Sequence, residues 1–260
     1  MRLLGVETSS AATSAALLVD GAVVSFAWHE DARGHVEALA ALVDQVRGEV
    51  VPDAVVCGVG PGPYSGLRVG LATAGVLALA WDVPVVGVCS LDAIAAAVVA
   101  WRRETASTAG AVDDPAPFMV AVDARRREEY WAGYDASGTR LAGPSIHAVA
   151  ERTGGPWFGS ALPESAALPT AGSAGSGPAG FPVLRYPSAE HVARIAALEL
   201  GSMPAATLQD VGDGLADQAA VELSAHGRDD GATARALHGR VLLPARPLYV
   251  RRPDVHQGKQ

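Results

Sequence analysis

The chain of 260 residues contains little cysteine and few aromatic residues, with two Cys, four Phe, five Trp and five Tyr. Two cysteines cannot build the dense disulfide framework of small secreted domains, and with no signal-peptide pattern they favour a reducing cytoplasm. Cys57 and Cys89 both stand inside apolar stretches, which favours unreactive core thiols. The richest apolar runs, Val69–Trp81 and Ala93–Trp101, are too short to cross a bilayer. We therefore expect a cytoplasmic protein that does not span a membrane.

Positive charge is also scarce, since the formal net charge is −8 at pH 7. Such a chain lacks the basic surface with which a protein binds nucleic acid on its own. The only basic triplet, Arg125-Arg126-Arg127, is followed directly by two glutamates. We interpret it as a solvated turn between predicted strands at Phe118–Asp123 and Glu128–Tyr134. The stretch Arg246–Arg252 predicts a final strand or a docking segment.

Groupings of catalytic residues are missing as well. Two histidines that bind a metal from one helix face stand one turn apart, but His35 has no such partner, since Leu39 stands at that distance and Ala40 follows it. His35 is therefore interpreted as a polar residue at a helix N-terminus. The stretch Gly62–Gly66 does not match the serine elbow G-x-S-x-G, because two residues separate Gly62 from Ser65. The sequence thus predicts no catalytic residue and no metal ligand.

A glycine-rich turn at Gly60–Gly70 is the most informative segment present. An apolar run at Val55–Val59 leads into it, and a helix is expected from Leu67 onward. Glycine permits positive φ and close backbone approach, so such a turn can hold an anion at the helix N-terminus. The pattern matches neither the dinucleotide fingerprint nor the P-loop. On spacing alone, a ligand-free strand-to-helix connection is equally compatible.

A polar segment, Glu7-Thr8-Ser9-Ser10, separates the first two predicted strands at Leu3–Val6 and Ala15–Val19. Asp20-Gly21 predicts a hairpin, after which Val23–Trp28 completes an antiparallel meander. An acidic residue followed by hydroxyl groups can hold a nucleotide phosphate and its metal. A simple hydrophilic turn explains the same residues.

Several of these motifs together resemble one known family. They are Glu7-Thr8-Ser9, His35-x-Glu37, the segment Gly60–Arg68, the segment Pro84–Ala93, and Asp123-Ala-Arg125 before Tyr130-Trp131. The chain resembles the TsaB (YeaZ) family, over residues 1 to about 135 and again at Pro247–Arg251. The resemblance implies an α/β fold of the actin-like, Hsp70-like ATPase type (ASKHA), with two similar lobes that each hold a mixed sheet flanked by helices.

The same resemblance implies a function and partners. The family's subunit does no chemistry itself in the synthesis of threonylcarbamoyladenosine on tRNA, but supports a homologous catalytic subunit of the TsaD type. A small ATPase of the TsaE type joins them, a homodimer is possible, and tRNA is contacted mainly through the partners. No cofactor is firmly implied for this chain, and ATP or ADP is expected only at the level of the complex. Glu7, Thr8, Ser9, Gly60 and Gly62 would form a vestigial phosphate site.

The helix expected at Leu67–Trp81 is apolar on all sides and must be buried in a core or against a partner. Small residues recur every four positions, at Gly70, Ala74 and Ala78, and permit another helix to approach closely. By resemblance, this helix and the one that begins at His35 meet the catalytic partner or a second copy. The predicted interface residues are His35, Leu67, Gly70, Leu71, Ala74, Leu77 and Ala78. A helix buried entirely within its own lobe is the alternative.

We divide the chain into an N-terminal lobe at 1–105 and a C-terminal lobe at 106–260, with Thr105–Pro117 as their connection. Ser188–Leu200 predicts a helix with a serine N-cap, and 201–239 is expected to be a mobile insertion. Two departures from the pattern implied by the resemblance weaken nucleotide binding: Glu7 stands where the superfamily usually has Asp, and Pro63 removes one hydroxyl and one amide donor. An independent enzyme of the same superfamily, either an ATP hydrolase or a metallopeptidase, is the alternative function.

Overall fold

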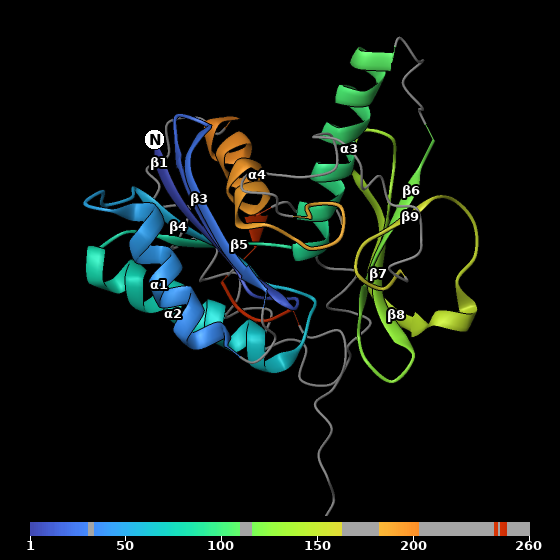
Figure 1. Ribbon diagram of the computed structural model, residues 1–260, viewed down its shortest axis with the longest axis horizontal. Helices are drawn as coiled ribbons and strands as arrows, with labels where there is room; N and C mark the ends of the chain where they lie inside the picture. The colour runs from blue at the N-terminus through green and yellow to red at the C-terminus, as the bar shows by residue number, and fades with distance from the viewer. Residues whose placement is uncertain (31–33, 110–115, 163–181, 203–241, 244, 249–260) are drawn as a thin grey trace, which may run out of the picture.

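The computed structural model describes residues 1–30, 34–109, 116–162, 182–202, 242–243 and 245–248. They form two β-sheets side by side, with helices against both (Figure 1). The first sheet has the strand order β10-β5-β4-β1-β2-β3 and the second β8-β7-β6-β9. The predicted two-lobe α/β fold with mixed sheets is therefore confirmed.

The first sheet is an antiparallel meander continued by two parallel strands, with β10 antiparallel at its edge. Its strands are β1 (Arg2–Glu7), β2 (Ala12–Val19), β3 (Ala22–Glu30), β4 (Ala54–Gly58), β5 (Val85–Val88) and β10 (Leu242–Leu243). The expected hairpin turn is present at Asp20-Gly21, where both residues have positive φ. β1 pairs antiparallel with β2 and parallel with β4, which puts β1 in the middle of the sheet.

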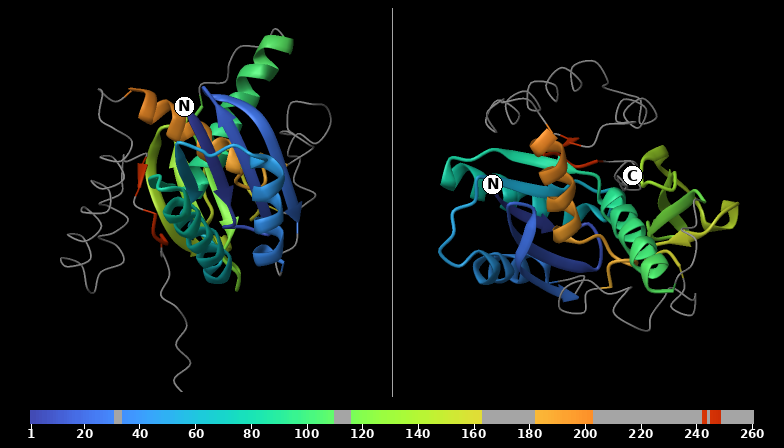
Figure 2. Two further views of the ribbon diagram at one scale, coloured as in Figure 1. Left: turned by 90° about the vertical axis from the view of Figure 1, so that its left-hand side faces the viewer. Right: turned by 90° about the horizontal axis from the view of Figure 1, so that it is seen from above.

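Helices cover both faces of the first sheet, as the two views of Figure 2 show. α1 (His35–Arg47) and α2 (Tyr64–Trp81) lie on one face, and α4 (Ala189–Ser202) lies on the other. Consecutive residues of β1 alternate between these faces, so Leu4 packs with the α1–α2 core and Leu3 with the α4 core. A strand buried on both faces explains why β1 and β4 are continuous apolar runs.

The second sheet repeats the beginning of the first. Its strands are β6 (Phe118–Asp123), β7 (Glu128–Tyr134), β8 (Arg140–Ala148) and β9 (Trp157–Phe158), and a short 3-10 turn, η1 (Val149–Glu151), follows β8. β6 pairs antiparallel with β7, β7 with β8, and β6 parallel with β9. The same pattern relates β1, β2, β3 and β4, so Asp123 at the end of β6 corresponds to Glu7 at the end of β1.

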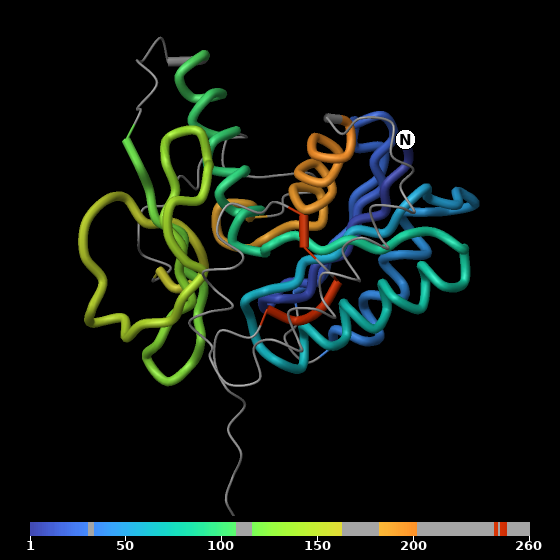
Figure 3. Tube along the Cα trace, turned by 180° about the vertical axis from the view of Figure 1, so that it is seen from behind, coloured from blue at the N-terminus to red at the C-terminus, as the bar shows by residue number. Residues whose placement is uncertain are grey.

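The division predicted at residue 105 lies after β5 of the first sheet and before β6 of the second. α3 (Ser90–Ala109) is one helix through that position, so the connection predicted at Thr105–Pro117 begins inside it. α4 and β10 lie beyond residue 105 but pack with the first sheet, because α4 supplies the apolar cover that its second face requires (Figure 3). Apart from Gly201 and Ser202, the insertion expected at 201–239 lies outside the described residues, as does Arg246–Arg252 from position 249 onward.

Candidate functional site

The glycine turn lies directly against the turn between β1 and β2. A Cβ added at Gly62 would lie 2.1 Å from the carbonyl oxygen of Ser9, and one at Gly66 would lie 2.4 Å from that of Thr8. Thr8 Oγ1 donates a hydrogen bond of 2.8 Å to the carbonyl oxygen of Gly66. The two polar segments found in the sequence therefore form one compact unit, in which glycine is required for close approach.

Glu7 is the buried centre of this unit. Its Oε1 accepts a hydrogen bond of 2.6 Å from the amide of Ser9, and its Oε2 accepts one of 2.8 Å from Ser90 Oγ. Ser90 Oγ also accepts a hydrogen bond of 3.1 Å from the amide of Gly60. Burial raises the pKa of the Glu7 carboxyl, and the hydrogen bonds from Ser9 and Ser90 oppose that shift. Through the hydroxyl of Ser90, Glu7 thus connects the end of β1 to the glycine turn and to the start of α3.

Several of the polar groups predicted to hold a phosphate already form hydrogen bonds within the chain. The carboxylate of Glu7, the hydroxyl of Thr8 and the amides of Ser9 and Gly60 are all used inside the chain. Pro61 and Pro63 have no amide hydrogen to donate. Ser9 Oγ is buried without a hydrogen-bond partner in the described part of the chain. The arrangement fits a network of internal hydrogen bonds that supports the fold better than a set of free donors that could bind a phosphate.

His35 is the first residue of α1 and is buried. Its Nδ1 lies 2.6 Å from Thr13 Oγ1, so it anchors the helix start to β2. No group of three or more His, Cys, Asp or Glu residues within the described ranges is arranged to hold a metal ion. His35 therefore packs inside its lobe, and its contact with a partner stays a prediction.

The two cysteines behave as the sequence predicts. Cys57 and Cys89 are free and fully buried, and burial raises the pKa of each thiol to about 12. A thiol with such a pKa carries no appreciable thiolate at neutral pH, which confirms unreactive core residues. Within the ranges that the structure describes, no helix is long and apolar enough to cross a membrane.

Comparisons with known proteins place the chain in a family. The family model for TsaD, tRNA N6-adenosine threonylcarbamoyltransferase, matches residues 29–204. The tRNA threonylcarbamoyladenosine biosynthesis protein TsaB of Escherichia coli is 33% identical over 139 residues, which cover 52% of this chain and 55% of that protein. An uncharacterized protein of Mycobacterium tuberculosis is 38% identical over 174 residues, which cover 64% of this chain and 74% of that protein. The chain belongs to the TsaB/YeaZ family.

The solved structures agree with the fold. YeaZ from Pseudomonas aeruginosa superposes with a TM-score of 0.54 at 24% identity, covering 80% of this chain and 96% of that one. A second Pseudomonas aeruginosa structure, described as similar to peptidase YeaZ, gives a TM-score of 0.56 at the same identity. At this level of identity the superposition supports the TsaB/YeaZ architecture rather than a particular activity.

The partner surface expected from the TsaB/YeaZ resemblance includes six residues of α2, most of which pack inside the chain. Leu67, Gly70, Ala74 and Ala78 are buried against the chain's own sheet, and Leu71 and Leu77 are half-buried. A Cβ added at Gly70 would lie 2.3 Å from Thr8 Oγ1. The small residues let α2 approach its own β1–β2 turn. The burial of Leu67, Gly70, Ala74 and Ala78 favours the alternative of an internal helix face, and the contact of Leu71 and Leu77 with a partner stays a prediction.

The opposite sides of α1 and α2 carry exposed apolar residues that our sequence reasoning missed. The exposed fractions are 61% for Val36, 66% for Val76 and 85% for Leu79. At the start of α2, Arg68 lies over the ring of Tyr64, with its guanidinium carbon 5.2 Å from the ring centroid. The available signal was the helical period itself: once the small residues face inward, positions 68, 72, 76 and 79 must face outward. Val76 and Leu79 lie one turn apart on α2, and we call these two residues the outer apolar face.

Proposed function

We propose that this chain is a non-catalytic subunit of the bacterial complex that makes threonylcarbamoyladenosine on tRNA, and that it supports a homologous catalytic subunit of the TsaD type. Family membership supports involvement in this pathway, because relatives from Escherichia coli and Haemophilus influenzae carry the name tRNA threonylcarbamoyladenosine biosynthesis protein TsaB. Their matches span about half of each relative, so the finer role is argued from this chain's own residues.

The internal hydrogen bonds of Glu7 support the first part of the proposal, that this chain performs no catalysis itself. Both of its carboxylate oxygens accept from groups of the same chain, Ser9 and Ser90, and its burial is complete. An ATP hydrolase or a metallopeptidase would need this carboxylate and the Thr8 hydroxyl for metal, water or phosphate. The Thr8 hydroxyl already donates a hydrogen bond to the carbonyl oxygen of Gly66. The alternative of an independent enzyme is therefore the less favoured function.

The outer apolar face supports the partner part of the proposal. Val76 and Leu79 lie one helical turn apart on α2, and each has more than half of its surface exposed. Adjacent, exposed aliphatic side chains of this kind mark protein contact sites. In this proposal they contact the catalytic subunit, or a second copy of the chain when that subunit is absent. The net charge of −8 is consistent with tRNA being held mainly by the partners, including a small ATPase of the TsaE type. Cytoplasmic location is part of the same proposal.

Reconstitution tests this function. The chain would be combined with the TsaD-type and TsaE-type proteins of the same organism, tRNA and a threonylcarbamoyl donor, and modified adenosine would be measured by mass spectrometry. We expect modification only when this chain and the catalytic subunit are both present. A double variant, Val76→Glu with Leu79→Glu, should remain folded and lose both association and modification. Modification by this chain alone would contradict the proposal.

A further inference from the structure

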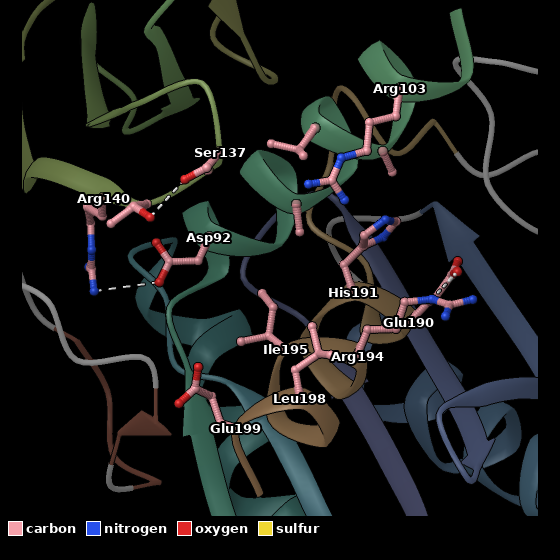
Figure 4. Close-up of a pocket in the computed structure, with 15 residues that line it drawn as sticks. Asp92, Arg103, Ser137, Arg140, Glu190, His191, Arg194, Ile195, Leu198 and Glu199 are labelled. Carbon is pink, nitrogen blue, oxygen red and sulfur yellow. Dashed lines mark hydrogen bonds and ion pairs between the residues drawn. The ribbon is translucent and has the colours of Figure 1, made fainter. Parts of the chain in front are cut away.

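A cavity of about 640 Å³ lies between α3 and α4, away from the glycine turn. α3 contributes Asp92, Ala96, Val99, Ala100 and Arg103, which recur on one helix face, and α4 contributes the residues on its facing side (Figure 4). The turn between β7 and β8 closes the cavity at Ser137–Arg140, and a Cβ at Gly138 would meet Val99 Cγ2 at 3.0 Å. Cavities of this size accommodate small organic molecules.

Most charges in the cavity are already compensated. Arg140 pairs with Asp92 at 3.5 Å, and Arg194 pairs with Glu190 at 2.9 Å. Asp92 also accepts a hydrogen bond of 2.7 Å from the hydroxyl of Tyr134. Two carboxylates are thereby neutralised by two guanidinium groups, and neither pair attracts a further ion strongly.

The charge of Arg103 is not compensated in this way. It is exposed, and among the described residues it forms no ion pair; Figure 4 shows its side chain turned from α3 into the space beside α4. His191 rises from α4 on the same side, and burial lowers its pKa to about 4, so its ring is neutral at pH 7. Its Nδ1 lies 2.8 Å from Ser188 Oγ, which leaves Nε2 for a ligand. The remaining carboxylate, Glu199, lies at the other end of the cavity in Figure 4.

The walls between these polar groups are apolar. Ala96, Val99, Ala100, Ile195 and Leu198 line the middle of the cavity. Leu198 is 75% exposed, although it faces a concave surface where an apolar ligand group could cover it. A ligand for this cavity therefore combines an apolar body with one charged group that complements Arg103.

We propose that this cavity binds a small organic anion, with its carboxylate or phosphate group on Arg103 and its apolar body against Val99, Ile195 and Leu198. α3 contributes to the core of the second sheet, whereas α4 covers the first. An occupant that contacts both helices therefore joins the two lobes and stabilises one angle between them. This inference is independent of the proposed role in tRNA modification.

Calorimetric titration and ligand-detected NMR on the full chain at pH 7 test the site. The probes are hexanoate, phenyl phosphate, inorganic phosphate and hexylamine. We expect saturable binding of hexanoate or phenyl phosphate, and which of the two binds more tightly distinguishes a carboxylate site from a phosphate-ester site. Inorganic phosphate and hexylamine should bind at least tenfold more weakly, because the first lacks the apolar body and the second reverses the charge.

Variants locate the binding. Arg103→Ala should weaken it roughly tenfold or more, whereas the control Arg47→Ala on α1 should leave it unchanged. Ala100→Trp, at an exposed position of the cavity wall, should block binding without lowering the unfolding temperature. The proposal is overturned if neither organic anion binds below about 10 mM, if inorganic phosphate binds equally well, or if Arg103→Ala has no effect.

Discussion

The hydroxyl of Ser90 donates a 2.8 Å hydrogen bond to the buried carboxylate of Glu7, and so ties the end of β1 to the first residue of α3. The residues are 83 positions apart in the chain. Glu7, which the sequence predicted as part of a vestigial phosphate site, joins two elements through this hydrogen bond. Several expectations depend on that contact.

The first concerns pH. Because burial raises the pKa of Glu7, the folded state holds the proton more tightly than the unfolded state does. Its contribution to stability is therefore complete below the ordinary value of 4.5 and decreases as pH rises through the raised pKa. Urea unfolding from pH 4 to pH 8 should show a smaller loss of stability for Glu7→Gln than for the parent chain. Equal slopes for the two proteins would mean that the carboxylate is not desolvated.

A matched pair of glycine substitutions tests the packing of α2. Gly70→Ala puts a Cβ within 2.3 Å of Thr8 Oγ1 and should destabilise the protein by roughly 1–3 kcal/mol. Gly75→Ala meets no atom within 4 Å and should stabilise it by about 0.5–1 kcal/mol, because alanine favours helix. Thermal unfolding of both variants checks the prediction. Similar effects of the two substitutions would show that α2 does not press on the β1–β2 turn.

Substitutions on opposite sides of α2 distinguish residues that belong to the core from residues that belong to the proposed partner interface. Ala74 is completely buried, so Ala74→Glu should cost more than about 4 kcal/mol and unfold much of the protein. Leu79 is 85% exposed, so Leu79→Glu should leave the unfolding temperature within a few degrees and weaken partner binding at least about tenfold. Size-exclusion chromatography and partner co-purification measure both effects. A folded Ala74→Glu protein that loses its partner would restore the small-residue stripe as an interface.

ATP provides a test of the glycine turn. Since the groups predicted to hold phosphate are engaged within the chain, millimolar ATP with magnesium should not raise the melting temperature of the isolated protein. A ligand present at a hundredfold excess over its dissociation constant would add about 2.7 kcal/mol of stability. A clear shift that disappears in Gly62→Ala would mean that the turn binds nucleotide.

The sequence predicted the strands and the glycine turn well because their signals are local. Asp20-Gly21 and the limits of β6 and β7 follow from turn residues and apolar runs. The orientation of α2 did not follow, since a helix that is apolar on every side has no single apolar face. The small residues recur every four positions, but that period does not tell whether they meet the chain's own sheet or a partner. The repeat of β1–β4 in β6–β9 left no visible sequence signal, because Glu7 and Asp123 stand in dissimilar surroundings. The return of α4 and β10 to the first sheet depends on contacts between distant segments.

The central claim is that this chain supports catalysis by a partner and performs none itself. The most direct measurement is modified adenosine in tRNA, determined by mass spectrometry in a system reconstituted with and without the TsaD-type subunit. The account predicts full modification with both proteins, none with this chain alone, and retained activity in Glu7→Gln. Modification by this chain in the absence of the partner, abolished by Glu7→Gln, would contradict it.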